Sequence, residues 1–478
     1  MPLKRRNRSL LLAASFGNRI LSLLNQPALS TETIMPWNLS FLRLGQSSDS
    51  VLARIKKHMG GDCRNTHILS HTIQPLEQVN LQLVLDKWME TGRDTGLFGY
   101  SFAAYSFEKS LAHLLQTPEA VAPVEREHCA ISMTETLDCV TRGVFLLRFG
   151  EHPIVIMIQK ADSLLRGRPT LELMAHQRSL AQEAFNRLLS EAKNESVFKG
   201  KYLSLEKEQV FDAGIKVRFH EWPTVSRDSI VLPEELMHVL ERNVLGILQN
   251  ADKLRQSGWG TRHGVLLHGA PGTGKTLVVR YLAQACKDHT IVLLTGKQLG
   301  AIRESFEVAR MLAPSIVVVE DVDLIAEDRS TNKQGVFLCE LMDEMDGLGA
   351  KTDCIILLTT NRPEVLEGAL AARPGRVDQA IEFPLPDEAS RRRLFDLYGR
   401  HMDLQWLDLD RWVDQSDGAS PAFIAELLRK AALFAAERGE TVPMKVRNTD
   451  IDQAIKELVL FGGDLTQKLL GYRKQDGP

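Results

Sequence analysis

The sequence predicts an α/β protein, in which a parallel sheet with helices on both faces follows a separate mixed α+β domain and precedes a small all-helical domain. Strands and helices alternate from about residue 227 to 386, which indicates parallel strands joined by crossover helices. Four short runs in this range are almost wholly apolar, as strands covered on both faces require. These runs are 265–267, 291–294, 316–319 and 355–358.

The same patterns divide the chain into five segments. Basic and small polar residues dominate the first 50 residues, and the chain after Pro386 has helical periodicity. We therefore expect a basic, weakly ordered segment over 1–50, a mixed α+β domain over 51–226, the α/β domain over 227–386, the helical domain over 387–462 and a C-terminal tail over 463–478.

Individual elements are also predicted in the two flanking domains. In the N-terminal domain we expect a helix beginning near Leu81, a helix over 171–193, and strands at 143–150, 153–158, 202–205 and 215–219. After Pro386 we expect helices over 389–398, 420–437 and 449–460. Ser420 is the expected N-cap of the second of these helices, and Pro421 is its first helical residue.

Composition excludes several classes of protein. The 478 residues are 44% hydrophobic and 25% charged, as in an ordinary globular protein, and the net charge of −3 gives no reason to expect a nucleic-acid partner. The six cysteines are scattered without a C-x-x-C pair, so we expect free thiols and a cytoplasmic location. No apolar run reaches the roughly 18 residues of a membrane span, so no transmembrane segment is expected.

The N-terminus is unusual because residues 1–31 contain basic side chains and no acid. The short run Leu10-Leu11-Leu12-Ala13-Ala14 lies among them, but a secretory signal would need a longer apolar core and a clear cleavage site. A frayed basic tail is the favoured interpretation. An organelle transit peptide and a surface-binding amphipathic helix remain open.

Residues 269–276 fit the pattern G-x-x-x-x-G-K-[ST] and directly follow a predicted strand. Glycines let successive backbone N–H groups turn inward around phosphates, and the following helix presents its N-terminus to the anion. Lys275 would reach the β- and γ-phosphates, and the Thr276 hydroxyl would ligate Mg²⁺. A glycine-rich surface loop is the alternative, which the flanking strand and helix disfavour. The predicted nucleotide-binding residues are Gly269, Ala270, Pro271, Gly272, Thr273, Gly274, Lys275, Thr276 and Leu277.

Polar side chains end the next predicted strands. Glu320 and Asp321 follow the strand at 316–319, where one acid would hold the hydration shell of Mg²⁺ and the other would orient the attacking water. Asn361 follows the strand at 355–358 and can bond the γ-phosphate or that water. The alternatives are a solvated acidic turn for the two acids and an ordinary turn before Pro363 for Asn361.

Two arginines three residues apart, Arg373 and Arg376, come later in the chain. A guanidinium carries a fixed charge and matches phosphate oxygens, so a neighbouring subunit could supply these side chains as arginine fingers. A salt-bridged surface loop is the alternative. Their order after the phosphate loop favours the catalytic interpretation.

These motifs, in this order, resemble the classical AAA family of ATPases within the AAA+ superfamily, as a divergent member, over about residues 227–462. Residues 341–348 resemble its intersubunit-signalling segment, and residues 361–387 resemble its second region of homology. The resemblance implies a P-loop NTPase sheet with Walker A and Walker B motifs, a helical lid after Pro386, Mg²⁺-dependent ATP hydrolysis and a homo-oligomeric ring, usually a hexamer. It further implies that Asn361 is a sensor and that Arg373 and Arg376 are trans-acting fingers. Residues 230–233 lie where the family contacts adenine.

The sequence departs from the family in three places. Glu320 and Asp321 replace the usual Asp-Glu pair, so the resemblance assigns water activation to Asp321 and the metal to Glu320. The Rieske-protein translocase branch of the family has the same order, so we still expect hydrolysis. The segment between Gly296 and Arg303 is short and has no aromatic residue, and the stretch after Arg329 is also short, which argues against threading of an unfolded chain. Pro421 and Ala422 replace the lid's usual Gly-Ala.

The expected function is an ATP-hydrolysing ring that remodels or moves a protein partner recognised by residues 51–226. A nucleotide-dependent oligomeric switch or scaffold with slow or vestigial hydrolysis is the alternative. A membrane-associated machine anchored by the basic N-terminus is a third hypothesis, and remodelling of nucleic acid is the least expected.

Overall fold

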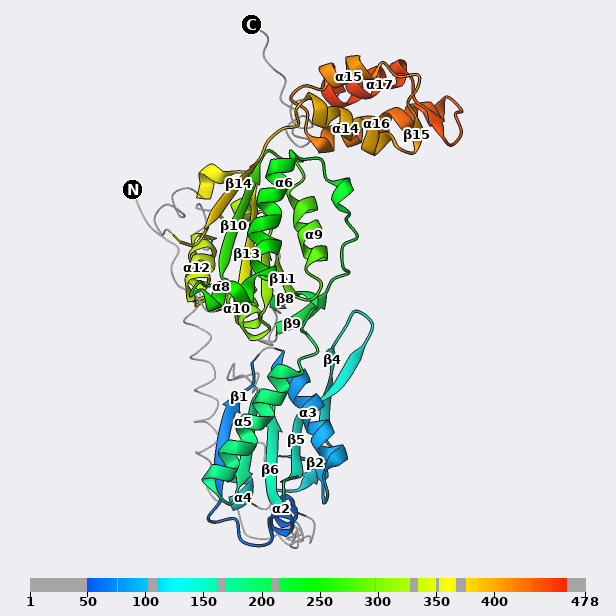
Figure 1. Cartoon of the computed structure of the whole chain (residues 1–478). Helices are drawn as coiled ribbons and strands as arrows, with labels where there is room; N and C mark the ends of the chain where they lie inside the picture. The colour runs from blue at the N-terminus through cyan, green and yellow to red at the C-terminus, as the bar shows by residue number, and fades with distance from the viewer. Residues whose placement is uncertain are drawn as a thin grey trace, which may run out of the picture. The chain divides into compact units, whose positions relative to one another are not determined.

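The computed structural model describes residues 50–461 except for 75, 102–109, 118, 161–168, 208–214, 297, 327–333, 350–351 and 367–374 (Figure 1). The predicted N-terminal segment, apart from Ser50, and the C-terminal tail therefore lie outside the described residues, as does Arg373. Within the described part of the chain, no helix is both long enough and apolar enough to cross a membrane.

The N-terminal domain is an antiparallel sheet with helices on both faces. Its strand order is β1-β7-β6-β5-β2-β3, and β4 pairs with β5. Residues of β5 alternate between the faces, because Phe145 packs with α3 and α5 while Val144 packs with α2 and α4. The strands are β1 (His67–Thr72), β2 (Gly96–Tyr100), β3 (Val121–Ala122), β4 (Glu125–Ala130), β5 (Thr136–Phe149), β6 (His152–Gln159) and β7 (Thr170–Ala175). The helices are α2 (Val51–Met59), α3 (Glu77–Thr91), α4 (Leu111–Gln116) and α5 (Arg178–Asn194).

The helix predicted over 171–193 begins only at Arg178. Its first residues instead form β7, which pairs with β6 on one side and β1 on the other. Leu171 and Leu173 are fully buried and alternate with the partly exposed Glu172, the period of a strand. That prediction was wrong at its start because only His176 and Gln177 separate the apolar strand from the helix.

The second sheet has the order β14-β10-β13-β12-β11-β8-β9. The pairs from β14 to β8 are parallel, and only the edge strand β9 is antiparallel to its neighbour. The predicted parallel sheet is thereby confirmed, with all four predicted apolar runs at its centre. The strands are β8 (Tyr202–Lys207), β9 (Ile215–Phe219), β10 (His263–Gly269), β11 (Thr290–Leu294), β12 (Ser315–Val319), β13 (Cys354–Thr360) and β14 (Gln379–Phe383).

Helices cover both faces of this sheet, as predicted. Ile316 and Val318 of β12 face the cluster that includes α6 and α9, whereas Val317 and Val319 face the cluster that includes α10 and α12. The helices are α6 (Glu234–Glu241), α7 (Ile247–Gln249), α8 (Ala251–Gln256), α9 (Lys275–Ala285), α10 (Ile302–Met311), α11 (Val322–Ala326) and α12 (Gln334–Gly347). Shorter helical turns are η2 (Arg227–Ser229), η3 (Arg242–Gly246) and η4 (Leu299–Ala301).

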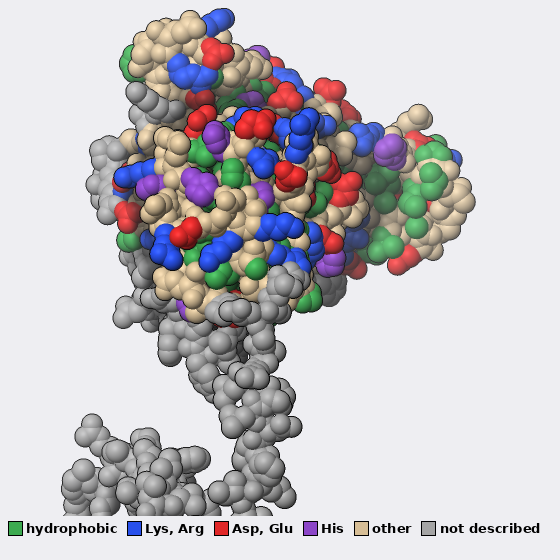
Figure 2. Space-filling view, turned by 90° about the horizontal axis from the view of Figure 1, so that it is seen from below, with side chains coloured by type: hydrophobic (Ala, Val, Ile, Leu, Met, Phe, Trp, Pro, Cys, Tyr) green, Lys and Arg blue, Asp and Glu red, His purple; other side chains and the backbone are tan. Residues whose placement is uncertain are grey.

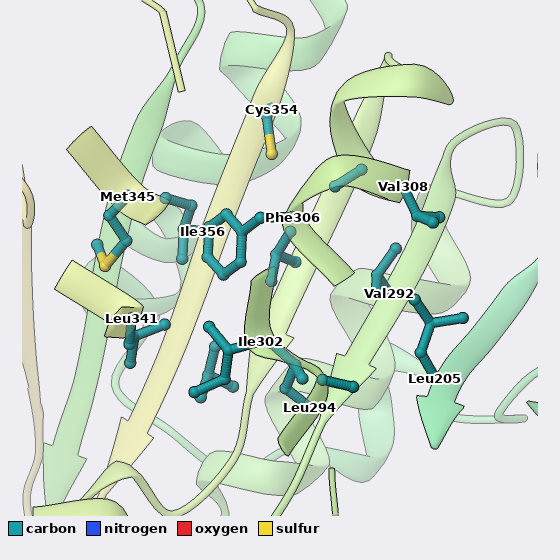
Figure 3. Packing of buried hydrophobic residues seen from close by; sticks show 14 of the residues in the cluster. Leu205, Val292, Leu294, Ile302, Phe306, Val308, Leu341, Met345, Cys354 and Ile356 are labelled. Atoms are coloured by element: carbon teal, nitrogen blue, oxygen red, sulfur yellow. The ribbon is translucent and has the colours of Figure 1, made fainter. Parts of the chain in front are cut away.

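Strands β8 and β9 lie inside the range 51–226 that the sequence assigns to the N-terminal domain, yet they belong to the second sheet. Tyr202 and Leu203 pair in parallel with Ile291 and Val292 of β11. Leu205 joins the same buried cluster as Val292 (Figure 3). This pairing joins residues about 90 positions apart, so local sequence patterns carry no signal for it.

The C-terminal domain contains the three predicted helices and a further one, α15. Ser420 caps α16 as predicted, because its side chain accepts a hydrogen bond from the Phe423 N–H. Two short parallel strands, which the prediction of an all-helical domain omitted, also occur. The elements are α14 (Glu388–Gly399), β15 (Met402–Asp403), α15 (Leu409–Gln415), α16 (Pro421–Glu437), β16 (Met444–Lys445), α17 (Asn448–Ile455) and η5 (Lys456–Phe461).

Candidate active site

Residues 269–276 form the loop between β10 and α9, so the predicted strand, loop and helix occur in that order. Gly274 has a φ of 99° and Gly269 a φ of 146°, values that residues with a side chain rarely adopt. A Cβ on Gly269 would also lie 2.4 Å from the carbonyl oxygen of Phe383. The loop backbone therefore requires glycine at these positions. Helix α9 begins at Lys275 and points its N-terminus at the loop.

The Lys275 side chain folds back onto the loop that is expected to bind phosphate. Its Nζ donates hydrogen bonds to the carbonyl oxygens of Gly269 at 2.9 Å and Ala270 at 3.0 Å. Burial lowers the pKa of Lys275 to about 8, against the opposing influence of the Asp321 and Asp323 carboxylates. Phosphate oxygens would add negative charge and restore the protonated form.

Glu320 follows β12 beside the phosphate loop. Burial, and then the charge of Asp321, raise its pKa above the usual range, although the Arg280 charge and the nearby Thr276 side chain act to lower it. The Thr276 hydroxyl and the Glu320 carboxylate are the kind of oxygen ligand that Mg²⁺ prefers, so these two residues fit the predicted metal role. Among the described residues, no cluster of three His, Cys, Asp or Glu side chains could hold a metal ion. The remaining ligands would therefore be water and phosphate.

Asp321 is oriented by its backbone and by the next strand. Its φ is 52°, in the left-handed region, and its N–H donates to the Thr359 hydroxyl at 3.0 Å. The Asn361 side-chain nitrogen donates to Asp321 Oδ1 at 3.3 Å. Burial and the nearby Asp323 carboxylate raise the pKa of Asp321. The structure thus brings together Lys275, Asp321 and Asn361, three of the predicted site residues, and their catalytic roles stay predictions.

Asp323 is a buried member of the site that the sequence analysis did not select. Its Oδ1 accepts hydrogen bonds from the Thr360 hydroxyl at 2.8 Å and from the Asn361 N–H at 3.1 Å. It therefore fixes the backbone that carries the Asn361 side chain. The sequence shows Asp323 as a third acid two residues after Asp321. Its hydrogen-bond partners, however, lie 37 and 38 residues further along the chain, so no local pattern marks it as part of the site.

A cavity of about 400 Å³ lies next to the phosphate loop. Its polar wall contains Lys275, Thr276, Asp321 and Asn361. The more apolar wall combines residues 229–231, which overlap the segment 230–233 expected to contact adenine, with Leu394 and Tyr398 of α14. Helix α16 reaches the same place, because the Ala422 N–H donates to the carbonyl oxygen of Gly272 at 3.2 Å. Leu394 and Tyr398 were not predicted as site residues, since an apolar helix face gives no sign of lining a cavity.

Arg376 does not lie free at the surface. Its side chain is 2% exposed and forms an ion pair with Asp346 of the same chain. This arrangement corresponds to the salt-bridged alternative considered from the sequence. For Arg373, which lies outside the described residues, the arginine finger stays a prediction.

Comparison with known proteins points to the same region. Residues 265–385 match the family described as "ATPase family associated with various cellular activities (AAA)". The human "ATPase family gene 2 protein homolog A" is 36% identical over 229 residues, which are 45% of this chain and 26% of that protein. The Dictyostelium discoideum "26S proteasome regulatory subunit 4 homolog" is 35% identical over 41% of this chain and 47% of its own. The Synechocystis "ATP-dependent zinc metalloprotease FtsH 3" is 34% identical over 48% of this chain and 39% of its own.

The matches thus span less than half of each of these relatives and less than half of this chain. The family match contains the phosphate loop, Glu320, Asp321 and Asn361. It also contains β10 to β14, the parallel core of the second sheet. The homology supports ATP binding at the site built from these residues. The chain therefore contains an AAA-family ATPase domain, distantly related to those of proteasome regulatory subunits, FtsH proteases and ATPase family gene 2 proteins.

Proposed function

We propose that this chain is a subunit of an ATP-hydrolysing ring that remodels or moves a protein partner. The hydrogen bond from Asn361 to Asp321, beside the buried Lys275, supports this proposal most directly. It joins a candidate base to a candidate water-orienting side chain at the edge of the sheet where nucleotides bind. A binding site without hydrolysis would not need this pair.

The residues present fit hydrolysis of the terminal phosphate of ATP. Lys275 and the loop N–H groups would hold the β- and γ-phosphates, and Mg²⁺ at Thr276 and Glu320 would neutralise charge on them. Asp321 would accept a proton from the attacking water while the water oxygen bonds to the γ-phosphorus. The bond from that phosphorus to the ADP oxygen then breaks. Asn361 would hold the water in line, and Arg373 of a neighbouring subunit would stabilise the charge that develops.

The N-terminal domain is the proposed recognition module. Its sheet has its own buried clusters on both faces, and Leu76, Val79 and Cys139 also join the buried cluster of the second sheet. On the face of the molecule drawn in Figure 2, acidic and basic side chains are interspersed. Such a mixed surface favours a protein partner over nucleic acid, which selects a predominantly basic face. All six cysteines are free thiols, which fits the proposed cytoplasmic location.

A test of hydrolysis compares the full-length protein with Asp321→Asn. Asparagine keeps the size of the side chain and tolerates the left-handed backbone, but it accepts no proton. We expect unchanged binding of a fluorescent ATP analogue and a loss of turnover of about 100-fold or more. Equal turnover in both proteins would contradict the role of Asp321 as the base.

A nucleotide-dependent switch is the second candidate, and one observation favours it. The segment between β11 and α10 has no aromatic residue that could grip a chain. It is instead tied to β8, because Gln298 bonds Glu206 at 3.4 Å and Glu304, on α10, pairs with Lys207 at 3.1 Å. Nucleotide-dependent assembly of wild-type protein without turnover would favour this candidate over the first.

A further inference from the structure

Residues 375–378 form a loop that is bound to the end of α12 within the same chain. Arg376 Nε donates to Asp346 Oδ1 at 2.9 Å, and Arg376 Nη2 donates to the other carboxylate oxygen. Asp343, one turn earlier on α12, lies 4.0 Å from the same nitrogen. The Arg376 side chain is 2% exposed, whereas that of Asp346 is 52% exposed. The guanidinium is therefore buried in a two-pronged ion pair inside its own subunit.

A second arginine holds the same loop. Arg262 Nη1 donates to the carbonyl oxygen of Met345 at 3.0 Å, and Arg262 Nη2 donates to that of Gly375. Arg262 thus joins the end of α12 to the residue immediately before Arg376. Because Arg262 precedes β10 directly, the contact also ties the loop to the strand that leads into the phosphate loop.

The main chain adds a third attachment. The Asp378 N–H donates to the carbonyl oxygen of Gly264 at 2.8 Å, and the Gly264 N–H donates to Asp378 Oδ2 at 2.8 Å. The backbone of Arg376 passes so close to Gly264 that a Cβ there would lie 2.2 Å from the Arg376 carbonyl oxygen. Side-chain and main-chain contacts therefore fix one position for this loop.

We propose that Arg376 is a positioning residue that acts inside its own subunit. With Arg262, it would hold the loop against α12 and β10 so that Arg373, three residues earlier, meets the nucleotide of the neighbouring subunit. A guanidinium that gives two donors to one carboxylate, and is almost fully buried, would have to break that pair before it could reach a phosphate of another chain. The inference rests on the proposed ring ATPase and assigns its two arginines different tasks.

The test removes the charge from each side of the ion pair in turn in the full-length protein. We expect Asp346→Asn and Arg376→Gln each to lower kcat at least about tenfold, because a displaced loop misplaces the finger, and to leave the KM for ATP unchanged. The double variant should be no slower than the slower single variant. Asp410→Asn is the matched control, because it breaks an exposed ion pair with Arg392 in the helical domain, and it should stay close to wild type. Thermal unfolding of each variant shows whether it is folded.

Experiments with mixed subunits show whether the defect lies in the variant's own nucleotide site or in that of its neighbour. Subunits with Asp346→Asn or Arg376→Gln keep their own nucleotide site, and Lys275→Ala subunits keep the loop, so mixtures of the two should regain activity. Wild-type turnover in Asp346→Asn, together with a loss in Arg376→Gln, would overturn the inference, as would additive losses in the double variant. Failure of the ring itself gives a different result, in which Arg373→Ala has no effect. In that case the ion pair can still be tested, because the effects of Asp346→Asn and Arg376→Gln on the unfolding temperature should not add in the double variant.

Discussion

The Asn361 side chain donates a hydrogen bond to Asp321 across the ends of two neighbouring parallel strands, at a distance of 3.3 Å. Asp321 has one methylene fewer than the glutamate usual in the AAA family, but its left-handed backbone and the bond from its N–H to Thr359 fix its direction. We infer that backbone geometry, rather than side-chain length, brings this acid to the water. Asn361 and Asp321 therefore work as one unit.

Removal of the Asn361 side chain should slow hydrolysis without weakening nucleotide binding. Asn361→Ala deletes the amide that orients Asp321 and the water, so we expect kcat to fall about 100-fold while KM changes little. Steady-state kinetics measure both constants. Asn250→Ala removes an exposed asparagine that bonds only a helix carbonyl among the described contacts, and it should leave both constants unchanged. Wild-type kcat in Asn361→Ala would contradict the sensor role.

Neutralisation of Asp323 should move the whole pH–rate profile to lower pH. Asp323→Asn keeps an oxygen that can accept from Thr360 and the Asn361 N–H, so it mainly removes a charge. That charge raises the pKa of Asp321 and also raises the pKa of Lys275. Without this charge the pKa values of Asp321 and Lys275 both fall, so the acid limb and the alkaline limb of the kcat/KM profile should both shift to lower pH. A profile with unchanged limbs would contradict this coupling.

ATP binding should take up a proton at alkaline pH. The pKa of Lys275 is lowered to about 8 in the nucleotide-free protein, so above that pH the amine is largely neutral. Phosphate favours the ammonium form, so affinity should weaken as the pH rises through about 8. Calorimetric titrations in buffers of different ionisation enthalpy measure the uptake. Near pH 7 the lysine is already charged, so the same titrations should show no uptake by this group. Equal uptake at both pH values would contradict the assignment.

Gly264 should not tolerate a side chain. A Cβ there would lie 2.2 Å from the carbonyl oxygen of Arg376, so Gly264→Ala must displace β10 or the loop. We expect a loss of about 1–3 kcal/mol in the free energy of unfolding, measured with denaturant. Gly296→Ala is the control, because no atom lies within 4 Å of its added Cβ. Equal stability of the two variants would show that the loop is not held at this position.

Tyr398 should contribute to binding of the nucleotide base. It lines the cavity from α14 and packs against the buried hydrophobic cluster of the helical domain, and burial raises the pKa of its hydroxyl. Tyr398→Ala should weaken ADP binding by about tenfold, since it removes a large apolar contact. Tyr398→Phe keeps the ring and should bind as wild type does. Displacement of a fluorescent nucleotide measures both affinities, and equal values for all three proteins would place the base elsewhere.

The sequence carried enough information for the parallel sheet and for the groups around the phosphates, because those signals are local. The apolar runs that became β10 to β13, the loop at 269–276 and the polar residues at strand ends can each be recognised within about ten residues. β8 could not be assigned to this sheet, because its partner β11 lies about 90 residues away. Arg376 could not be separated from Arg373 for the same reason. Its partner Asp346 lies 30 residues earlier, and the two arginines look alike in sequence.

The most direct test is steady-state ATP hydrolysis across a concentration series of wild-type protein, Asp321→Asn and Arg373→Ala. An assembled ring requires turnover per subunit to rise cooperatively with concentration in wild type and to collapse in both variants. Mixing Arg373→Ala with Lys275→Ala subunits should then restore turnover, since each supplies what the other lacks. Turnover that is independent of concentration and unaffected by Arg373→Ala would contradict a ring with trans-acting fingers. Absence of turnover with intact ATP binding would contradict an ATP-hydrolysing machine.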